Sequence, residues 1–265
     1  MLKKRIIFTL LYDDGYFVLS RNFRLQRVGN LEWLKKNYNF SHIAFYIDEL
    51  VVLDVSRNNR SIENFSTMLK ELSAECLVPI AAGGGINTLS DGKKMLRSGA
   101  DKLVINTALF KNTNLVKELC EEYGKQCIVG SFDVKILNNQ IEFFVMNGTE
   151  KIDSSINDPF NSLPTEFLGE MYLNSIERDG TGQGYEFEIL DYIPSYIKIP
   201  VIMSGGVGNY KHLIEGINHQ RIDAASTAHL FNFIGDGLFK ARESLLSQGV
   251  ELAYWPDISS LTLNE

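Results

Sequence analysis

The sequence predicts an α/β fold, a (β/α)8 TIM barrel built from two similar half-barrels. Two short apolar runs, one after Pro79 and one after Pro200, each end in a glycine-rich turn, and Gly84 lies 121 residues before Gly205. Such runs are too short for ordinary helices and are typical of buried parallel strands. The chain's 265 residues also match the roughly 250 residues usual for one such barrel. This internal repeat sets the fold prediction before local propensity does.

Expected strands alternate with expected helices along most of the chain. We expect strands at residues 4–11, 50–54, 103–105, 127–133, 171–176, 201–203 and 224–227, with one more ending at the 83–85 turn. We expect helices at residues 31–38, 62–74, 89–98, 115–123, 187–196, 210–218 and 239–248. Strands that alternate with helices require a parallel sheet, and eight of them close into a barrel. We therefore expect one barrel domain over residues 1–265, with half-barrels near 1–122 and 123–250 and a tail at 251–265.

Three segments depart from this alternation. Residues 16–24 follow the Asp13–Gly15 turn and are expected to connect the first strand to the first helix. Residues 134–137 and 141–146 predict a hairpin around Asn138-Asn139, because such residues favour tight two-residue turns. Residues 149–165 are polar and contain two prolines, so a fifth helix there is expected to be short or broken.

The composition is typical of a soluble globular protein and argues against several classes of function. Apolar residues make up 45% of the chain, yet no apolar run approaches the roughly 18 residues of a membrane span. The formal net charge of −7 argues against a nucleic-acid partner, because no basic excess neutralises phosphates. No signal-peptide pattern follows Met1, so we expect a cytoplasmic protein without a membrane partner. The three cysteines and four histidines lack metal-ligand spacing, so we expect reduced core thiols, no metal and no cofactor.

Hydrogen-bond donors gather at the expected carboxyl ends of the strands, where the active face of such barrels lies. Two glycine turns, each near an Asn-Thr or Ser-Thr pair, predict two anion cradles made of backbone N–H groups and hydroxyls. Half-barrel symmetry places them on opposite sides of the mouth, which suits a small ligand with a phosphate at each end. Alternatively, the glycines only permit tight turns. The residues expected to bind phosphate are Gly84, Asn106, Thr107, Asp179, Gly180, Thr181, Ser204, Gly205, Gly206, Ser226 and Thr227.

Six motifs resemble the cyclase subunit of imidazole glycerol phosphate synthase, HisF, from Met1 to about Val250. They are KRII (4–7), DELVVLD (48–54), GGGI (83–86), GADKLVINTA (99–108), RDGTGQGY (178–185) and SGGVG (204–208). The resemblance implies a (β/α)8 barrel of histidine biosynthesis that receives ammonia from a HisH-like glutaminase docked at its bottom. In that family, ammonia crosses the barrel and attacks a bisphosphate ribonucleotide at the top. Two facing aspartates, at the ends of strands one and five, act as general acid and base.

The match to this family is complete at the bottom of the barrel. The family's charged ring at the ammonia entrance contains an Arg, two Glu and a Lys, and the corresponding residues here are Arg5, Glu49, Glu170 and Lys102. The family's partner-facing aspartate corresponds to Asp101. An unpaired arginine inside a barrel would cost several kcal/mol, so we expect the two glutamates to pair with Arg5. Such a ring is interpreted as an ammonia gate, or alternatively as a structural plug.

The match is incomplete at the top. The strand-five aspartate is present as Asp133, but Leu11 stands where the family has its strand-one aspartate. Leu19 and Val104 replace a family lysine and serine in the same way. A leucine cannot transfer a proton, and general acid–base help is worth typically ~10²–10⁴-fold in rate. Asp13 has the same strand parity as Leu11 and is a weak candidate to substitute for it, about 7 Å higher in the barrel.

A second class of HisF-like protein fits this division better. In bacteria that make amidinated surface sugars, a HisF-like protein and a glutaminase accompany an N-acetyl sugar amidotransferase and are proposed to supply it with ammonia. The resemblance to this class implies an ammonia-conducting subunit without cyclase activity. The alternatives are an authentic cyclase (a lyase) with a rearranged acid–base pair, and a silent scaffold that activates the glutaminase. Arg21, Arg24 and Arg27 predict either a solvated loop or a docking patch for an acidic partner or a sugar nucleotide.

Overall fold

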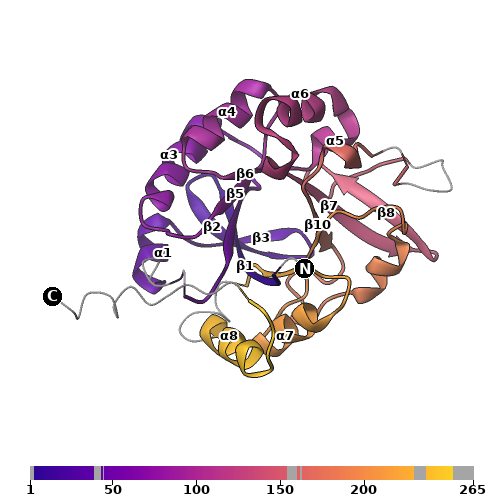
Figure 1. The fold of residues 1–265 in the computed structure, drawn as a ribbon. Helices are drawn as coiled ribbons and strands as arrows, with labels where there is room; N and C mark the ends of the chain where they lie inside the picture. The colour runs from indigo at the N-terminus through magenta and orange to yellow at the C-terminus, as the bar shows by residue number, and fades with distance from the viewer. Residues whose placement is uncertain are drawn as a thin grey trace.

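A computed structural model of the chain describes residues 3–38, 43, 45–153, 160–161, 163–229 and 237–252. The predicted (β/α)8 barrel is confirmed, and Figure 1 shows its ring of strands inside a ring of helices. Neighbouring barrel strands are parallel, and pairing between β10 and β7 closes the ring. The barrel strands are β1 (Arg5–Asp13), β4 (Glu49–Asp54), β5 (Ile80–Gly83), β6 (Lys102–Ile105), β7 (Ile128–Leu137), β10 (Glu170–Ser175), β11 (Val201–Ser204) and β12 (Ala224–Thr227).

The helices lie outside the barrel, and several of them begin at polar side chains that cap the first turn. Thr88 and Asp91 form a reciprocal capping box at the start of α4, while the side chains of Ser61 and Asn209 cap α3 and α7. These caps satisfy backbone N–H groups that a helix leaves unpaired at its first turn. The helices are α1 (Leu31–Asn37), α3 (Ile62–Ser73), α4 (Leu89–Arg97), α5 (Thr107–Lys111), α6 (Thr113–Tyr123), α7 (Tyr210–Asn218) and α8 (Gly237–Ser247). No described helix is long and apolar enough to cross a membrane.

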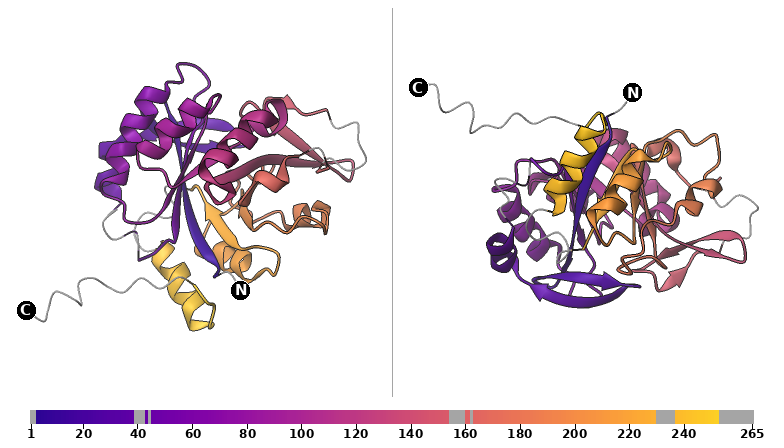
Figure 2. Two further views of the ribbon diagram at one scale, coloured as in Figure 1. Left: turned by 45° about the horizontal axis from the view of Figure 1, so that its top comes forward. Right: turned by 90° about the horizontal axis from the view of Figure 1, so that it is seen from below.

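Residues 16–24 do lead from the first strand toward the first helix, as expected, but they form strands that the sequence analysis did not predict. Asp14 and Gly15 both have positive φ, so a tight turn folds β1 back onto β2 (Tyr16–Arg21). A second turn of this kind, at Asn22 and Phe23, leads into β3 (Arg24–Gly29), which pairs antiparallel with β2. Figure 2 shows these two strands lying across the end of the barrel opposite the start of β1.

Other connections agree with the sequence more closely. The expected hairpin is present as β7 and β8 (Gln140–Val145), with Asn138 and Asn139 at positive φ in its turn; β9 (Glu150–Lys151) extends it. The helix expected at 187–196 is instead a 3₁₀ helix, η3 (Phe187–Tyr192). It ends at Ile193 because Pro194 disfavours helical backbone at the preceding residue. Two further 3₁₀ turns are η1 (Lys125–Cys127) and η2 (Thr165–Phe167).

Two expected segments lie partly outside the described residues. The broken helix expected at 149–165 includes residues 154–159 and 162, and the tail expected at 251–265 includes residues 253–265.

Three aspartates make the same contact at the bottom of the barrel, where the strands begin. The carboxylates of Asp48, Asp101 and Asp223 each accept a hydrogen bond from an N–H at the start of a neighbouring strand (Ile6, Ile80 and Val201), at 2.7, 2.8 and 2.9 Å. Asp101 and Asp223 do this at equivalent places in the two halves of the chain. Asp101, the expected partner-docking residue, is exposed, and its hydrogen bond to the Ile80 N–H orders the start of β5.

The inside of the barrel is built in layers, because alternate residues of each strand point inward. One layer takes an apolar side chain, at most 3% exposed, from every barrel strand: Ile7, Val51, Ala81, Val104, Val129, Tyr172, Ile202 and Ala224. On four of the barrel strands a charged residue lies two positions before the apolar layer. On most of the eight strands a polar residue lies two positions after it. The larger core packs between the barrel and its helices.

Candidate functional site

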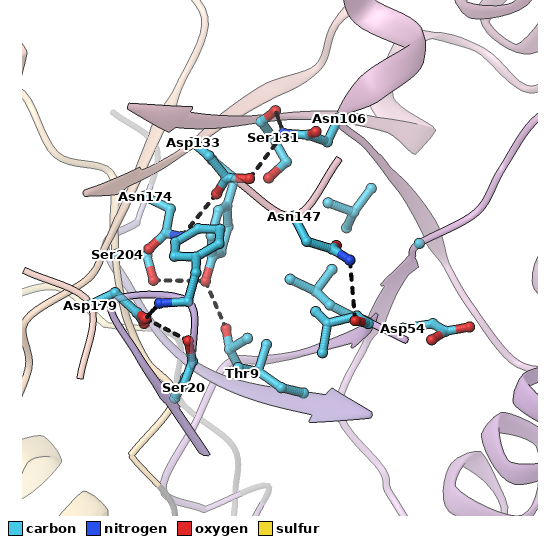
Figure 3. A pocket seen from close by; sticks show the side chains of 18 of the residues that line it. Thr9, Ser20, Asp54, Asn106, Ser131, Asp133, Asn147, Asn174, Asp179 and Ser204 are labelled. Carbon is cyan, nitrogen blue, oxygen red and sulfur yellow. Dashed lines mark hydrogen bonds between the residues drawn. The ribbon is translucent and has the colours of Figure 1, made fainter. Parts of the chain in front are cut away.

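A cavity of about 500 Å³ opens at the top of the barrel, where the strands end. Its floor is a cluster of hydroxyl groups directly above the apolar layer. Thr9 Oγ1 lies 2.7 Å from Ser226 Oγ and 3.0 Å from the Tyr172 hydroxyl, which donates to Ser204 Oγ at 2.8 Å. All four side chains are buried and line the cavity, and Figure 3 labels two of them, Thr9 and Ser204. The floor therefore offers both donors and acceptors at the point where an axial path through the barrel would end.

Asp133 of β7 projects into the cavity between two asparagines (Figure 3). Its Oδ1 accepts a hydrogen bond from Asn174 Nδ2 at 2.9 Å and its Oδ2 accepts one from Asn106 Nδ2 at 3.2 Å. Burial raises the pKa of Asp133 to about 7; the Asn174 amide opposes this rise and the carboxylate of Asp179 adds to it. A carboxyl group with this pKa exchanges a proton near neutral pH, as a general acid or base requires.

No second acid faces Asp133 from the end of β1 in the described cavity wall. Leu11 lines the cavity there, together with Leu19 and Leu53. The expectation that Asp13 faces inward is wrong: Asp13 is absent from the described lining, and its carboxylate lies 3.7 Å from Arg27 Nε. The parity argument fails because β1 leaves the barrel wall before Asp13 and continues into the hairpin with β2.

Asp179, expected to bind phosphate, instead holds the β2–β3 hairpin over the cavity. Its Oδ2 accepts hydrogen bonds from Ser20 Oγ at 2.5 Å and from the Phe23 N–H at 2.9 Å (Figure 3). Burial raises the pKa of Asp179, and these two donors oppose the rise. Phe23 has a φ of 62°, a strained value for a bulky residue, and its ring lines the cavity. The hairpin is thus a fixed part of the cavity wall.

Most other residues expected at the two cradles lie in the cavity wall. Gly84 and Gly205 adopt φ values of 104° and 90°, and a Cβ at either would collide with backbone of the neighbouring strand end. These turns therefore need glycine for steric reasons, whether or not they bind an anion. Lining the cavity are Gly84, Asn106, Thr107, Asp179, Gly180, Ser204, Gly205, Gly206, Ser226 and Thr227. Thr181 is absent from the lining, and its hydroxyl donates to the Arg178 carbonyl.

At the opposite end of the barrel, four charged side chains form a closed ring. Arg5 contacts Glu49 at 2.7 Å and Glu170 at 2.8 Å, while Lys102 contacts the same two carboxylates at 2.9 and 3.1 Å. The ring is electrically neutral, and Glu49 is the most buried member, with 3% of its side chain exposed. Burial raises the pKa of Glu49, opposed by Lys102 and Arg5. The structure thus brings all four expected gate residues together.

Several cavity residues were missed by the sequence reasoning. Arg57 and Arg60 lie in the loop between β4 and α3, Asn174 follows the apolar layer on β10, and Asn147 follows β8. Asn174 could have been found, because it lies two residues after inward-facing Tyr172 on an expected strand. The others lie in loops, whose side-chain directions follow no sequence period.

The raised pKa of Asp133 predicts a pH-dependent stability. A carboxyl whose pKa is higher in the folded protein than the ordinary ~3.9 destabilises the fold as pH rises from that value to about 7. Asp133→Asn removes this penalty. The free energy of unfolding of the variant, relative to that of the unaltered protein, should therefore increase from pH 5 to pH 8. We expect a change on the order of 2 kcal/mol, because Asp133 is only partly buried in the cavity wall and solvent screening reduces the effect of the shift. Urea unfolding of both proteins at the two pH values measures it, and a constant difference would contradict the prediction.

Comparisons with known proteins agree with this geometry. A family model described as histidine biosynthesis protein matches residues 29–234. A protein from Parasynechococcus marenigrum (strain WH8102), provisionally named imidazole glycerol phosphate synthase subunit hisF2, is 43% identical over 265 residues, covering 100% of this chain and 98% of the relative. The imidazole glycerol phosphate synthase subunits HisF of Chlorobium phaeovibrioides and Chlorobaculum parvum are 35% and 36% identical over 254 residues, covering 94% of this chain and 98% of each relative.

Proposed function

Since this chain belongs to the HisF family of imidazole glycerol phosphate synthase subunits, we propose that it conducts ammonia for a different acceptor. In this proposal, a HisH-like glutaminase docks at the bottom of the barrel and releases ammonia there. The ammonia passes the charged ring and the apolar layer, emerges at the hydroxyl cluster, and serves an N-acetyl sugar amidotransferase that amidinates a surface sugar.

The contrast between the two ends of the barrel carries this proposal. At the bottom, Arg5, Glu49, Lys102 and Glu170 retain a complete ring of ion pairs. Two positive and two negative charges in a closed ring repel no neutral molecule, yet an ion that entered would have to displace one of the ring members. A barrel that only needed a plug could use apolar side chains at similar or lower cost.

At the top, the described cavity has lost the arrangement that cyclisation needs. Asp133 is opposed by Leu11 rather than by a second carboxyl, and Asp13 contacts Arg27 outside the cavity. Full-length similarity at 43% to a protein named as a second hisF, against 35–36% to HisF subunits, is consistent with a divergent role. The sugar acceptor itself is inferred from the resemblance to HisF-like proteins of sugar amidination.

A second candidate is an authentic cyclase that works with one acid–base group. The observation that favours it is Asp133, which keeps a pKa of about 7 and two ordered amide neighbours inside a cavity of suitable size. In that case Asp133 would have to act as both acid and base in successive steps.

We expect Lys102→Ala to uncouple glutamine hydrolysis from ammonia delivery. Removing Lys102 opens one side of the ring while Arg5 still bridges Glu49 and Glu170, so the barrel should remain folded and bound to its glutaminase. The measurement is the ratio of amidinated sugar to glutamate formed by the chain, its glutaminase and the amidotransferase. This ratio should fall severalfold with glutamine and stay unchanged when ammonium salt replaces glutamine.

The control is Lys94→Ala, since Lys94 pairs with exposed Glu63 on the barrel's outside, away from the ring. An unchanged ratio in Lys102→Ala, with binding to the glutaminase intact, would reduce the ring to a structural plug. Normal glutaminase activation with no ammonia reaching the acceptor in the unaltered protein would instead favour the silent scaffold.

A further inference from the structure

Tyr172 is the aromatic member of the apolar layer, and its side chain reaches across the inside of the barrel. It begins on β10, yet its hydroxyl lies 3.0 Å from Thr9 Oγ1 on β1, three strands away around the ring. The same hydroxyl contacts Ser204 of β11 at 2.8 Å and Ser226 of β12 at 3.2 Å. Because every member of the layer is at most 3% exposed, the layer closes the barrel axis directly beneath these hydroxyls.

The four hydroxyl groups make more contacts with one another than their hydrogens can supply. A hydroxyl donates one hydrogen bond and accepts two. The Tyr172 hydrogen goes to Ser204, which leaves the hydrogens of Thr9 and Ser226 for the three contacts among Thr9, Ser226 and Tyr172. The Ser204 hydrogen has no acceptor among the described residues. The cluster therefore lacks a donor beside Thr9 and Ser226 and has an unused donor at Ser204.

We propose that this cluster binds one molecule of neutral ammonia, which accepts a hydrogen bond from Ser204 and donates to Thr9 and Ser226. Ammonia has three N–H donors and one lone pair, so it supplies the donor that the cluster lacks and accepts the one that it does not use. All three oxygens lie within 3.2 Å of the Tyr172 oxygen, so a molecule on their cavity side can reach them together. The inference rests on the proposed ammonia route and assigns its last site inside the barrel.

The site favours ammonia over the ammonium ion, because it offers hydroxyls and no charge. The described partners of the four hydroxyl oxygens are one another, while the carboxylate of Asp133 contacts the amides of Asn106 and Asn174 instead. Burial raises the pKa of Tyr172, opposed by its hydroxyl partners, so the phenol stays protonated. A buried cation without a carboxylate partner is costly. Since the neutral form alone has the lone pair that attacks carbon, the site would hold ammonia ready to react.

Carbon-13 NMR of the full-length chain, labelled at the ζ carbon of tyrosine, tests the site without a glutaminase or an acceptor. One resonance, identified by its loss in Tyr172→Phe, should shift as ammonium chloride is added at constant ionic strength. We expect a Kd on the order of 0.1 M, close to the limit for a ligand with one non-hydrogen atom. The midpoint in total ammonium should be severalfold lower at pH 9.5 than at pH 8.5, because ammonium loses its proton over this range. Asp133, with a pKa of about 7, is ionised at both values.

Two variants separate this site from a general effect of ammonia on the protein. Thr9→Val keeps the shape of the side chain and retains Tyr172 as the reporter, but removes one hydroxyl from the cluster. It should weaken binding about fivefold, the typical net effect of one neutral hydrogen bond. Tyr12→Phe removes another buried tyrosine hydroxyl, in the core between barrel and helices and absent from the described cavity lining, and should leave the midpoint unchanged.

The proposal is overturned if the Tyr172 resonance shows no saturable shift up to about 1 M total ammonium, or if Thr9→Val binds normally. Equal midpoints at the two pH values would show that the ion binds, and would overturn it as well. A negative titration would remove this site and leave the ammonia route, which Lys102→Ala tests. An unchanged product ratio in Lys102→Ala would remove the route and leave the site.

Discussion

Given saturating ammonium, the purified chain is expected to form imidazole glycerol phosphate at least about 100-fold more slowly than HisF cyclases. The reason is local: Asp133 can exchange a proton near pH 7, but the opposite wall offers Leu11, which cannot. Free ammonium bypasses the glutaminase, so a low rate would reflect the cavity and not the ring. The rate is measured with the bisphosphate ribonucleotide substrate of the cyclase.

Leu11→Asp tests whether one residue accounts for the loss. If it restores part of the rate, the missing group is the strand-one acid alone; if it does not, the replacements at Leu19 and Val104 contribute as well. Leu25→Asp places a carboxyl elsewhere in the same apolar wall and serves as the control. A rate equal to that of HisF cyclases in the unaltered chain, or growth of a histidine auxotroph that lacks its cyclase, would show that Asp133 suffices.

Glu49→Ala is expected to lower the free energy of unfolding by about 3 kcal/mol, because it leaves two largely buried cations, each with 19% of its side chain exposed, sharing one carboxylate. Glu49 contacts both Arg5 and Lys102 and is the most buried member of the ring. Breaking a buried pair by removing one partner costs more than the pair contributes, since the remaining charge stays buried. Urea unfolding followed by circular dichroism at pH 7 gives the value.

A surface pair provides the comparison. Glu63→Ala removes the partner of Lys94, and both side chains are largely exposed, so the loss should stay below about 1 kcal/mol. A similarly small loss for Glu49→Ala would mean that solvent reaches the ring and screens it, and that the ring is open more often than the structure indicates.

The sequence alone determined the barrel and the position of its layers. The 121-residue repeat of glycine turns indicated two halves, and the strand period of two placed Arg5, Ile7, Thr9 and Leu11 on one inward face. These features are local: a glycine turn needs only its own backbone, and side-chain direction in a strand follows from spacing. For the same reason, Asn138-Asn139 sufficed to predict the β7–β8 hairpin.

The tertiary structure alone decided where each strand leaves the barrel wall and which loop residues reach the cavity. Asp13 has the right parity but lies beyond the point where β1 turns into the hairpin with β2, so its carboxylate meets Arg27 instead of Asp133. Likewise, Asp179 meets Ser20 across 159 residues of sequence, and Arg60 reaches the cavity from a loop. Such contacts depend on barrel closure and on the path of connections, which bring together residues whose separation in sequence carries no periodic signal.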